Sequence, residues 1–246
     1  MTTQALTKLL RVKHPIIQGP FGGFRSQPLT AAVSNFGGLG SLGANSLEPA
    51  QLSDAIAELR ALTAQPFAVN LWVSTEDSTA ASSDRAAFER SLVALAPHFR
   101  ELGAPLPNYK RYPILNFGAQ ARAVLDAQVP VFSFIFGVPP DNLVQECRRR
   151  GIVTIGTATT PAEAIALERA GMDAIVASGF EAGGHRGSFL ARPEDSLVGT
   201  IALVPQVCNV VSVPVIAAGG TPKMKLNTGT FASSTARACA AKFMLG

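Results

Sequence analysis

The residue types best suited to chemistry gather in one short stretch, residues 175–189, where an apolar run ends in a glycine-rich loop. Glycines such as Gly183 and Gly184 let the backbone approach a ligand closely, so successive N–H groups can bind a phosphate or carbonyl oxygen. His185 follows directly, and an imidazole titrating near pH 6.5 (about the ordinary value) suits a general base. Arg186 either binds an anionic group or forms a surface ion pair. The alternative is a tight turn whose charged side chains simply face water.

Three further places along the chain carry residues that could line the same site. Residues 19–23 follow the first apolar run, and their glycines would let a flat or anionic ligand reach the backbone. Asn70 lies inside an apolar run, where it is either a ligand-binding amide or a core amide that the backbone satisfies. A last apolar run, residues 213–217, leads into two more glycines. The candidates outside the histidine loop are therefore Pro20, Phe21, Gly22, Gly23, Asn70, Gly219 and Gly220.

Short apolar strands alternate with helical stretches along most of the chain. Repeated strand–helix units of about 20 residues predict an α/β fold with parallel strands and crossover helices. In a (β/α)8 TIM-type barrel the carboxyl ends of all strands meet at one face, which would collect the candidates around one pocket. No G-x-G-x-x-G motif opens a helix, so a Rossmann nucleotide site is not supported. The expected strands are residues 15–18, 37–43, 67–73, 131–136, 152–155, 173–177 and 213–217, and the expected helices are residues 28–35, 53–64, 85–95, 120–127, 141–150, 161–170 and 201–211.

Length and charge bound the domain organisation and the partners. The 246 residues suit one large domain, residues 1–220, followed by a tail, residues 221–246, with four basic and no acidic residues. Elsewhere acidic and basic residues are equal in number, so no nucleic-acid partner is expected. Residues 74–112 interrupt the alternation of strands and helices and are a candidate lid.

Cysteines and hydrophobic runs bear on the location of the protein. The three cysteines are far apart and include no C-x-x-C pair, so no zinc site is expected. No apolar run reaches the ~18 residues that span a bilayer, and the N-terminus lacks the apolar segment of a signal peptide. We therefore expect a cytoplasmic protein without a membrane segment.

Six segments carry a family resemblance when they are read together. The most specific is Gly-Phe-Glu-Ala-Gly-Gly-His-Arg-Gly at residues 179–187. The others are His-Pro-Ile-Ile-Gln-Gly-Pro (14–20), Gly-Gly-Leu-Gly (37–40), Pro-Phe-Ala-Val-Asn (66–70), Phe-Ile-Phe-Gly (134–137) and Pro-Val-Ile-Ala-Ala-Gly-Gly (214–220). With these segments the chain resembles, over about residues 10–220, the nitronate monooxygenases, formerly called 2-nitropropane dioxygenases. Members of that family are FMN-dependent (β/α)8-barrel enzymes.

The resemblance implies a site and a reaction. His185 matches the family's catalytic histidine, the base that takes the α-proton of a neutral nitroalkane or interacts with a nitronate anion. The implied reaction oxidises an alkyl nitronate, such as propionate 3-nitronate, with O2 to a carbonyl compound and nitrite. The chain would then be a flavoprotein oxidoreductase of the monooxygenase type that serves nitroalkane detoxification, with a homodimer as a further expectation. The implied FMN-binding residues are Pro20, Phe21, Gly22, Gly23, Asn70, Ser178, Gly183, Gly184, Gly219 and Gly220.

Two departures from the family pattern affect these expectations. Ser178 stands where the family commonly has glutamine, and its shorter side chain would lose a contact to the flavin ring. After Gly220 the usual helix and eighth strand are missing, and residues 227–231 only loosely match the family's phosphate loop. We therefore expect a barrel truncated or altered after strand 7, with two exposed sheet edges. Two alternatives stay open: an NAD(P)H-dependent FMN quinone or enoyl-thioester reductase of the same barrel type, and an inactive truncated chain.

Overall fold

The computed structural model describes residues 3–22, 26–73, 85–109, 115–219 and 243–245. Two members of the predicted site, Gly23 and Gly220, lie outside these ranges, as do residues 227–231 with their expected phosphate loop. The chain divides into two compact units, one formed by Met1–Ser74 with Phe117–Gly246 and the other by Thr75–Asn116. In the part of the chain that the structure describes, no helix could span a membrane, and no three His, Cys, Asp or Glu side chains are grouped to hold a metal ion.

The larger unit is built on eight parallel strands that close into a barrel. Neighbouring strands pair in the order β1-β8-β7-β6-β5-β4-β3-β2. The two ends of this order also meet, because parallel bridges join Ile17 to Leu39 and Phe21 to Leu42. This is the predicted (β/α)8 class. The strands are β1 (Ile17–Gln18), β2 (Gly40–Gly43), β3 (Phe67–Trp72), β4 (Val131–Ile135), β5 (Val153–Ala158), β6 (Ala174–Ser178), β7 (Val215–Ala218) and β8 (Phe243–Leu245).

The eighth strand is short and comes from the last residues described. Phe243 of β8 is in register with Ala217 of β7, and Met244 is in register with Ile17 of β1. The edges of β7 and β1, which the sequence predicts to be exposed, are therefore paired along these residues. A three-residue apolar segment is too short to give a recognisable strand signal, which is why the sequence does not predict it.

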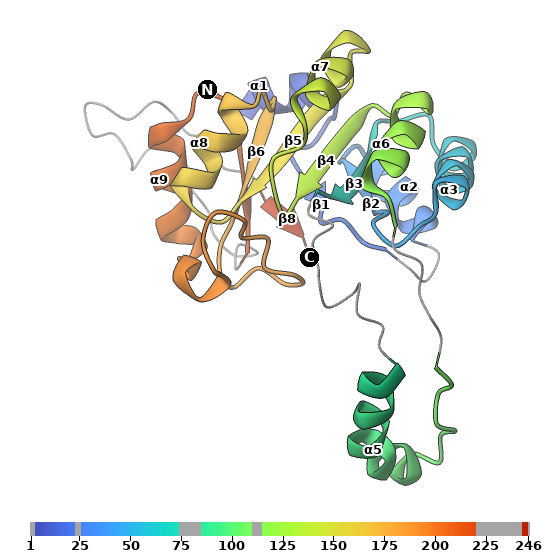
Figure 1. The fold of residues 1–246 in the computed structure, drawn as a ribbon. Coiled ribbons are helices and arrows are strands. Elements are labelled where there is room, and N and C mark those ends of the chain that lie inside the picture. Colours follow the sequence, from blue (N-terminus) through green and yellow to red (C-terminus); the bar gives the residue numbers. More distant parts are fainter. Residues whose placement is uncertain (1–2, 23–25, 74–84, 110–114, 220–242, 246) are drawn as a thin grey trace. The chain divides into compact units, whose positions relative to one another are not determined.

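Helices surround the strands on the outside of the barrel (Figure 1). The sequence does not predict α1 (Thr3–Leu10), whose Leu6 and Leu10 pack into the barrel interior, or the short 3-10 helix η1 (Pro193–Ser196). α3 begins earlier than predicted, because Pro49 occupies its first turn and Glu48 and Gln51 form a capping box. The remaining helices of this unit are α2 (Gln27–Phe36), α3 (Pro49–Leu62), α6 (Phe117–Asp126), α7 (Asp141–Arg149), α8 (Pro161–Arg169) and α9 (Thr200–Val210).

Alternation along the strands divides the core into an inner and an outer part. The inner cluster includes Ala68 of β3 and Val176 of β6, together with Leu6 of α1. The outer cluster packs the strands against the helices. Side chains along a strand point alternately to its two faces. Asn70 lies two residues after Ala68, and Ser178 lies two residues after Val176, so both side chains point inward as well. Both therefore lie at the carboxyl mouth of the barrel.

The smaller unit contains one described helix, α5 (Arg85–Glu101). Phe88 on this helix lies edge-on to Tyr109, with ring centroids 5.5 Å apart. Tyr109 therefore packs within its own unit, as the side chains of a folded insertion do. The role of residues 74–112 as a lid stays a prediction.

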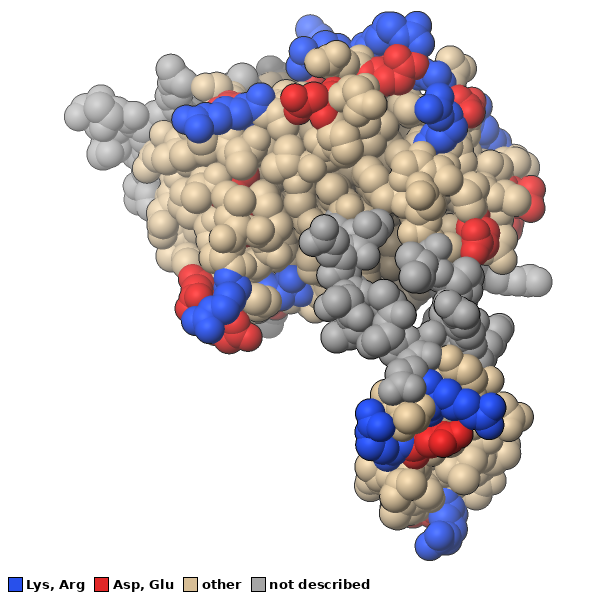
Figure 2. All heavy atoms as spheres, viewed as in Figure 1, with Lys and Arg blue, Asp and Glu red and all other residues tan. Residues whose placement is uncertain are grey.

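Charged side chains of both signs lie beside one another on the face that Figure 2 presents. Exposed pairs of opposite charge form within single helices, as Arg85 with Glu89 on α5 and Arg192 with Asp195 at η1. Each such pair contributes little to stability because water screens it. The described part of this face therefore carries mixed charge and no stripe of one sign.

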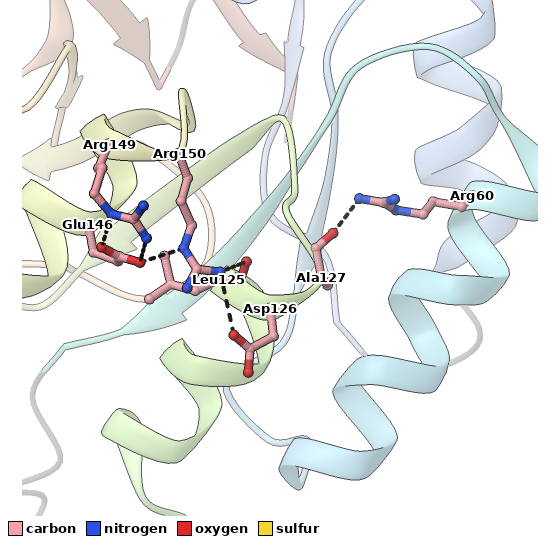
Figure 3. A network of polar contacts seen from close by, with 7 residues as sticks. All are labelled: Arg60, Leu125, Asp126, Ala127, Glu146, Arg149 and Arg150. Carbon is pink, nitrogen blue, oxygen red and sulfur yellow. Dashed lines mark hydrogen bonds and ion pairs between the residues drawn. The ribbon is translucent and has the colours of Figure 1, made fainter.

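Arginine side chains connect helix ends on the outside of the barrel (Figure 3). Arg150, which follows α7, donates to the carbonyl oxygen of Leu125 at 2.7 Å and to the Glu146 carboxylate at 2.6 Å. Arg60 of α3 donates to the carbonyl oxygen of Ala127, just past α6. The last carbonyl groups of a helix have no partner within it, and cationic donors satisfy them. The two arginines thus link α6 to the helices on either side.

Glu146 gives the fold an acid-sensitive contribution to stability. Hydrogen bonds from Arg149 and Arg150 lower the pKa of Glu146 from 4.5 to about 2. A lowered carboxylate pKa adds stability that is complete above the pKa of the unfolded chain and is lost as the pH falls toward the folded value. Glu146→Gln should therefore unfold at a lower urea concentration than the wild type at about pH 6, and the difference should shrink below about pH 4. A difference that stays constant over this range would contradict the assignment.

Candidate functional site

His185 lies at the carboxyl mouth of the barrel against two aromatic rings. Its imidazole is 4.8 Å from the ring of Trp72 and 6.3 Å from that of Phe136, both centroid to centroid and edge-on. The two aromatic rings are themselves 5.0 Å apart. Trp72 ends β3 and Phe136 follows β4, while His185 belongs to the loop after β6. Three strands thus deliver their ends to one histidine, as the barrel prediction requires.

The imidazole of His185 is exposed, and its nitrogens form no hydrogen bond with any described residue. Its orientation is therefore set by ring packing, which favours edge-to-face contact. Phe136 reaches this cluster with a backbone φ of 64°, in the left-handed region that phenylalanine rarely adopts. Strain of this kind persists where the surrounding structure enforces it and is frequent at functional sites.

A buried polar pair lies inside the barrel below this cluster. Asn70 is 4% exposed, and its side-chain amide donates to the Ser133 hydroxyl oxygen at 3.0 Å. Ser133 in turn donates to the carbonyl oxygen of Val69 at 3.5 Å. Asn70 is thus satisfied in the core, but by a side chain on the next strand rather than by the backbone. Ser178 points into the same interior from β6, where it is half-buried.

The first glycine loop, described over residues 19–22, reaches the mouth beside β2, the neighbour of β3. Gly22 and Gly43 approach so closely that a Cβ at Gly22 would lie 2.7 Å from the Gly43 carbonyl oxygen. Gly43 is in register with Asn70, so the loop stands one strand away from the polar pair. Pro20 and Phe21 are exposed there, Phe21 by 51%. Glycine is needed at Gly22 because the two backbones touch.

Gly183 and Gly184 leave open space on the other part of the mouth. A Cβ at either position would have no other described atom within 4 Å, and Gly184 has a φ of +81°. Gly219 differs, because at φ +111° its Cβ would lie 2.6 Å from the Thr200 hydroxyl oxygen. Gly183 and Gly184 therefore have room around their backbone, whereas Gly219 is closely packed.

The amino end of α9 fixes the beginning of the histidine loop. The Glu181 carboxylate accepts from the Thr200 backbone N–H at 2.9 Å, and the Thr200 hydroxyl donates to the Ala218 carbonyl oxygen at 3.0 Å. Burial opposes ionisation of Glu181, but hydrogen bonds from its own N–H and from Thr200 outweigh it and lower the pKa of Glu181. The loop is thereby attached both to α9 and to the end of β7.

Arg186 braces the loop instead of facing water. It donates to the carbonyl oxygen of Ser178 at 2.7 Å and also to the carbonyl oxygen of Ser196. Burial lowers the pKa of its guanidinium. A third contact is to the Ser196 hydroxyl oxygen at 3.4 Å, and the described contacts of Arg186 include no surface ion pair. A role in binding an anionic group stays a prediction.

Trp72, Phe136 and Ser133 belong to this mouth, but sequence reasoning did not single them out as site residues. Two signals were available. Trp72 is two residues after Asn70 on one strand and so shares its inward face. Phe136 stands in the Phe-Ile-Phe-Gly segment that carries part of the family resemblance.

Two glycines of this loop differ in how much room their surroundings leave for a Cβ atom. Gly179→Ala should destabilise the chain by about 1–3 kcal/mol, because its Cβ would lie 2.0 Å from the Thr200 hydroxyl oxygen and 2.5 Å from the Thr200 nitrogen. Gly183→Ala places its Cβ in open space and should change stability by less than about 0.5 kcal/mol. Urea unfolding of both variants tests this, and equal losses would contradict the described packing.

Known proteins are similar to this chain over most of its residues. A family model for nitronate monooxygenase matches residues 3–231. Probable nitronate monooxygenases of Staphylococcus aureus strains JH9 and MRSA252 are 45% identical to the chain over 217 residues, covering 87% of this chain and 60% of each relative. A solved nitroalkane oxidase from Streptomyces ansochromogenes is similar with a TM-score of 0.70 at 37% identity, covering 87% of this chain and 60% of that one.

Other solved structures share the architecture at lower similarity. FabK from Thermotoga maritima has a TM-score of 0.62 at 30% identity and covers 86% of this chain and 52% of its own. The enoyl reductase domain of MlnA from Bacillus amyloliquefaciens has a TM-score of 0.58 at 13% identity, which speaks to the fold alone. The chain spans 60% of the length of the curated relatives that it matches. Because the family model and relatives at 45% identity cover most of its residues, the chain belongs to the nitronate monooxygenase family.

Proposed function

We propose that this chain is an FMN-dependent oxidoreductase that oxidises alkyl nitronates with O2 to a carbonyl compound and nitrite, with His185 as the base. The observation that carries the proposal is an imidazole with both nitrogens unpaired among the described residues, held by Trp72 and Phe136 at the carboxyl mouth of the barrel. The family's name and the similarity to a nitroalkane oxidase support the same substrate class. Propionate 3-nitronate is the first substrate to test, and nitroalkane detoxification in the cytoplasm is the proposed role.

The described residues at the mouth are suited to a flavin. Gly183 and Gly184 offer accessible backbone, and exposed Phe21 offers an apolar surface for a flat ring. The Gln18 side-chain oxygen, buried at the end of β1, has no hydrogen-bond partner among the described residues and is an acceptor that a ligand could use. Asn70 brings a buried amide. Pro20, Gly22, Ser178 and Gly219 would complete the described part of the FMN site, and bound FMN would supply the one-electron chemistry of nitronate oxidation.

His185 would handle the proton of the substrate. A neutral nitroalkane, R–CH2–NO2, becomes a nitronate, R–CH=NO2⁻, by losing one α-proton. An imidazole nitrogen without a hydrogen-bond partner can accept that proton, and the imidazolium then stands beside the new anion with opposite charge. Trp72 and Phe136 hold the ring by packing, which leaves its nitrogens for the substrate. A preformed nitronate needs no such transfer.

Replacing the base should separate the two substrate forms. His185→Asn should lower kcat/KM for a neutral nitroalkane by about 10²-fold or more, and should lower it less for the matching nitronate. His14→Asn is the matched control, because His14 also packs on an aromatic ring, that of Phe36 at 5.2 Å, but before β1 at the opposite mouth. Steady-state oxygen uptake with both substrates gives the ratio. Equal losses on both would remove the base role from His185.

Cofactor binding can be tested without turnover. The purified chain should acquire a protein-bound flavin absorption spectrum after FMN is added and the excess removed. Gly183→Ala should fold normally but retain less FMN, because the added methyl occupies space that the wild type leaves open. A chain that stays colourless with FMN would favour the inactive alternative, and rapid bleaching by NAD(P)H without nitronate would favour the reductase alternative.

A further inference from the structure

Glu163 is a fully buried residue, and both of its carboxylate oxygens accept hydrogen bonds. It is 0% exposed in the first turn of α8. One oxygen accepts from the backbone N–H and the hydroxyl of Thr159, each at 2.7 Å. The other accepts from the backbone N–H groups of Phe189 at 2.7 Å and Leu190 at 3.1 Å. Burying a carboxyl group is costly unless it is fully hydrogen-bonded, so these four contacts act as one unit.

A chain of hydroxyl groups continues from this unit to the neighbour of His185. The Thr159 hydroxyl lies 3.0 Å from that of Ser188, which lies 2.5 Å from that of Ser196. Arg186 donates to the carbonyl oxygen of Ser196. The network that begins at Glu163 therefore reaches Arg186, Ser188, Phe189 and Leu190.

Residue 187 is fixed by packing instead of by hydrogen bonds. A Cβ at Gly187 would lie 2.6 Å from Ile135, so the Gly187 backbone rests directly on β4. All residues from 186 to 190 are thus held on the carboxyl side of His185. On its amino side, Gly183 and Gly184 have open space around them. The placement of His185 therefore depends mainly on residues 186–190.

We infer that Glu163 is a positioning residue for His185: the buried carboxylate holds the segment after the histidine and so keeps the imidazole against Trp72 and Phe136. The inference rests on the proposed function for the importance of His185, although the positioning itself is measurable without catalysis. The printed contacts of Glu163 are to Thr159, Phe189 and Leu190 and not to the imidazole, so its effect on His185 is indirect.

The experiment is NMR of the full chain with labelled histidine rings. The chain has three histidines, so few signals need assignment, and His185→Asn identifies one of them. The rings of Trp72 and Phe136 displace the His185 signal through their ring currents, while Phe36 does the same for His14. Glu163→Gln turns one acceptor oxygen into an NH2 group that faces donors. It should move the His185 signal toward that of an unfolded histidine and leave the His14 signal in place.

Glu168→Gln is the matched control. Glu168 is in the last turn of the same helix, and its carboxylate also accepts from two backbone N–H groups, Ser212 at 2.5 Å and Val213 at 3.2 Å. That contact lies at the amino end of β7, away from the histidine loop. Glu168→Gln should therefore leave all three histidine signals in place. A His185 signal that does not move in Glu163→Gln, or that moves equally in both variants, would overturn the inference.

A second variant decides the matter if Glu163→Gln fails to fold. Ser188→Ala interrupts the hydroxyl chain without burying a mismatched group, and it should move the His185 signal in the same direction. An unmoved signal would overturn the inference.

Activity then separates the inference from the proposed function. Glu163→Gln should lose roughly tenfold or more in kcat on neutral nitroalkanes, and less on nitronates, because a displaced base transfers protons poorly. Equal losses on both substrates would overturn the positioning of a base. If the wild type with FMN turns over neither substrate, the proposed function fails, while the NMR result still decides the role of Glu163.

Discussion

The closure of the sheet through β1 is the constraint on which the rest of the barrel depends. The Gln18 N–H donates to the Leu39 carbonyl oxygen and the Leu39 N–H donates to that of Ile16, both at 2.9 Å, so the chain at β1 is hydrogen-bonded to the residue just before β2 as well as paired with β8. A closed parallel sheet has all its carboxyl ends at one mouth. The loops after β1, β3, β4 and β6 meet there for that reason alone.

The site shows how a barrel assigns different tasks to residues of one loop. Glu181 attaches the loop to α9, Arg186 attaches it to the end of β6, and His185 between them is left without a polar partner among the described residues. The carboxylate of Glu181 and the guanidinium of Arg186 thus bond to backbone groups of neighbouring segments. The His185 imidazole, which packs against the rings of Trp72 and Phe136, remains available for chemistry, and Phe136 supplies its ring from a strained backbone.

Sequence patterns predict seven of the eight strands and most helices because apolar periodicity and turn residues are local signals. At the start of α8, for example, either Thr159 or Thr160 could cap the helix by its position before Pro161, and in the structure the cap is Thr160. The placement of His185 after a strand followed from the same reasoning, and the comparisons confirm the family. The features that could not be predicted depend on pairs far apart in the chain. Nothing local in α8 indicates that Glu163 bonds to residues 189 and 190, or that Trp72 touches His185. Leu6 and Leu10 enter the barrel core from a helix too short to stand out.

The two carboxylates of α8 have a consequence for how this protein can vary. Glu163 binds the chain shortly after β6 and Glu168 binds it shortly before β7, so the long connection between these strands begins and ends on one helix. Between these ends Ser196 of η1 bonds to Arg186 and Ser188, so a change of length that displaced Ser196 would be transmitted to the histidine loop. Residues 191–195 are exposed, so relatives can insert or delete residues there at low cost as long as Ser196 keeps its place, and a tag or a binding loop could be grafted at the same residues.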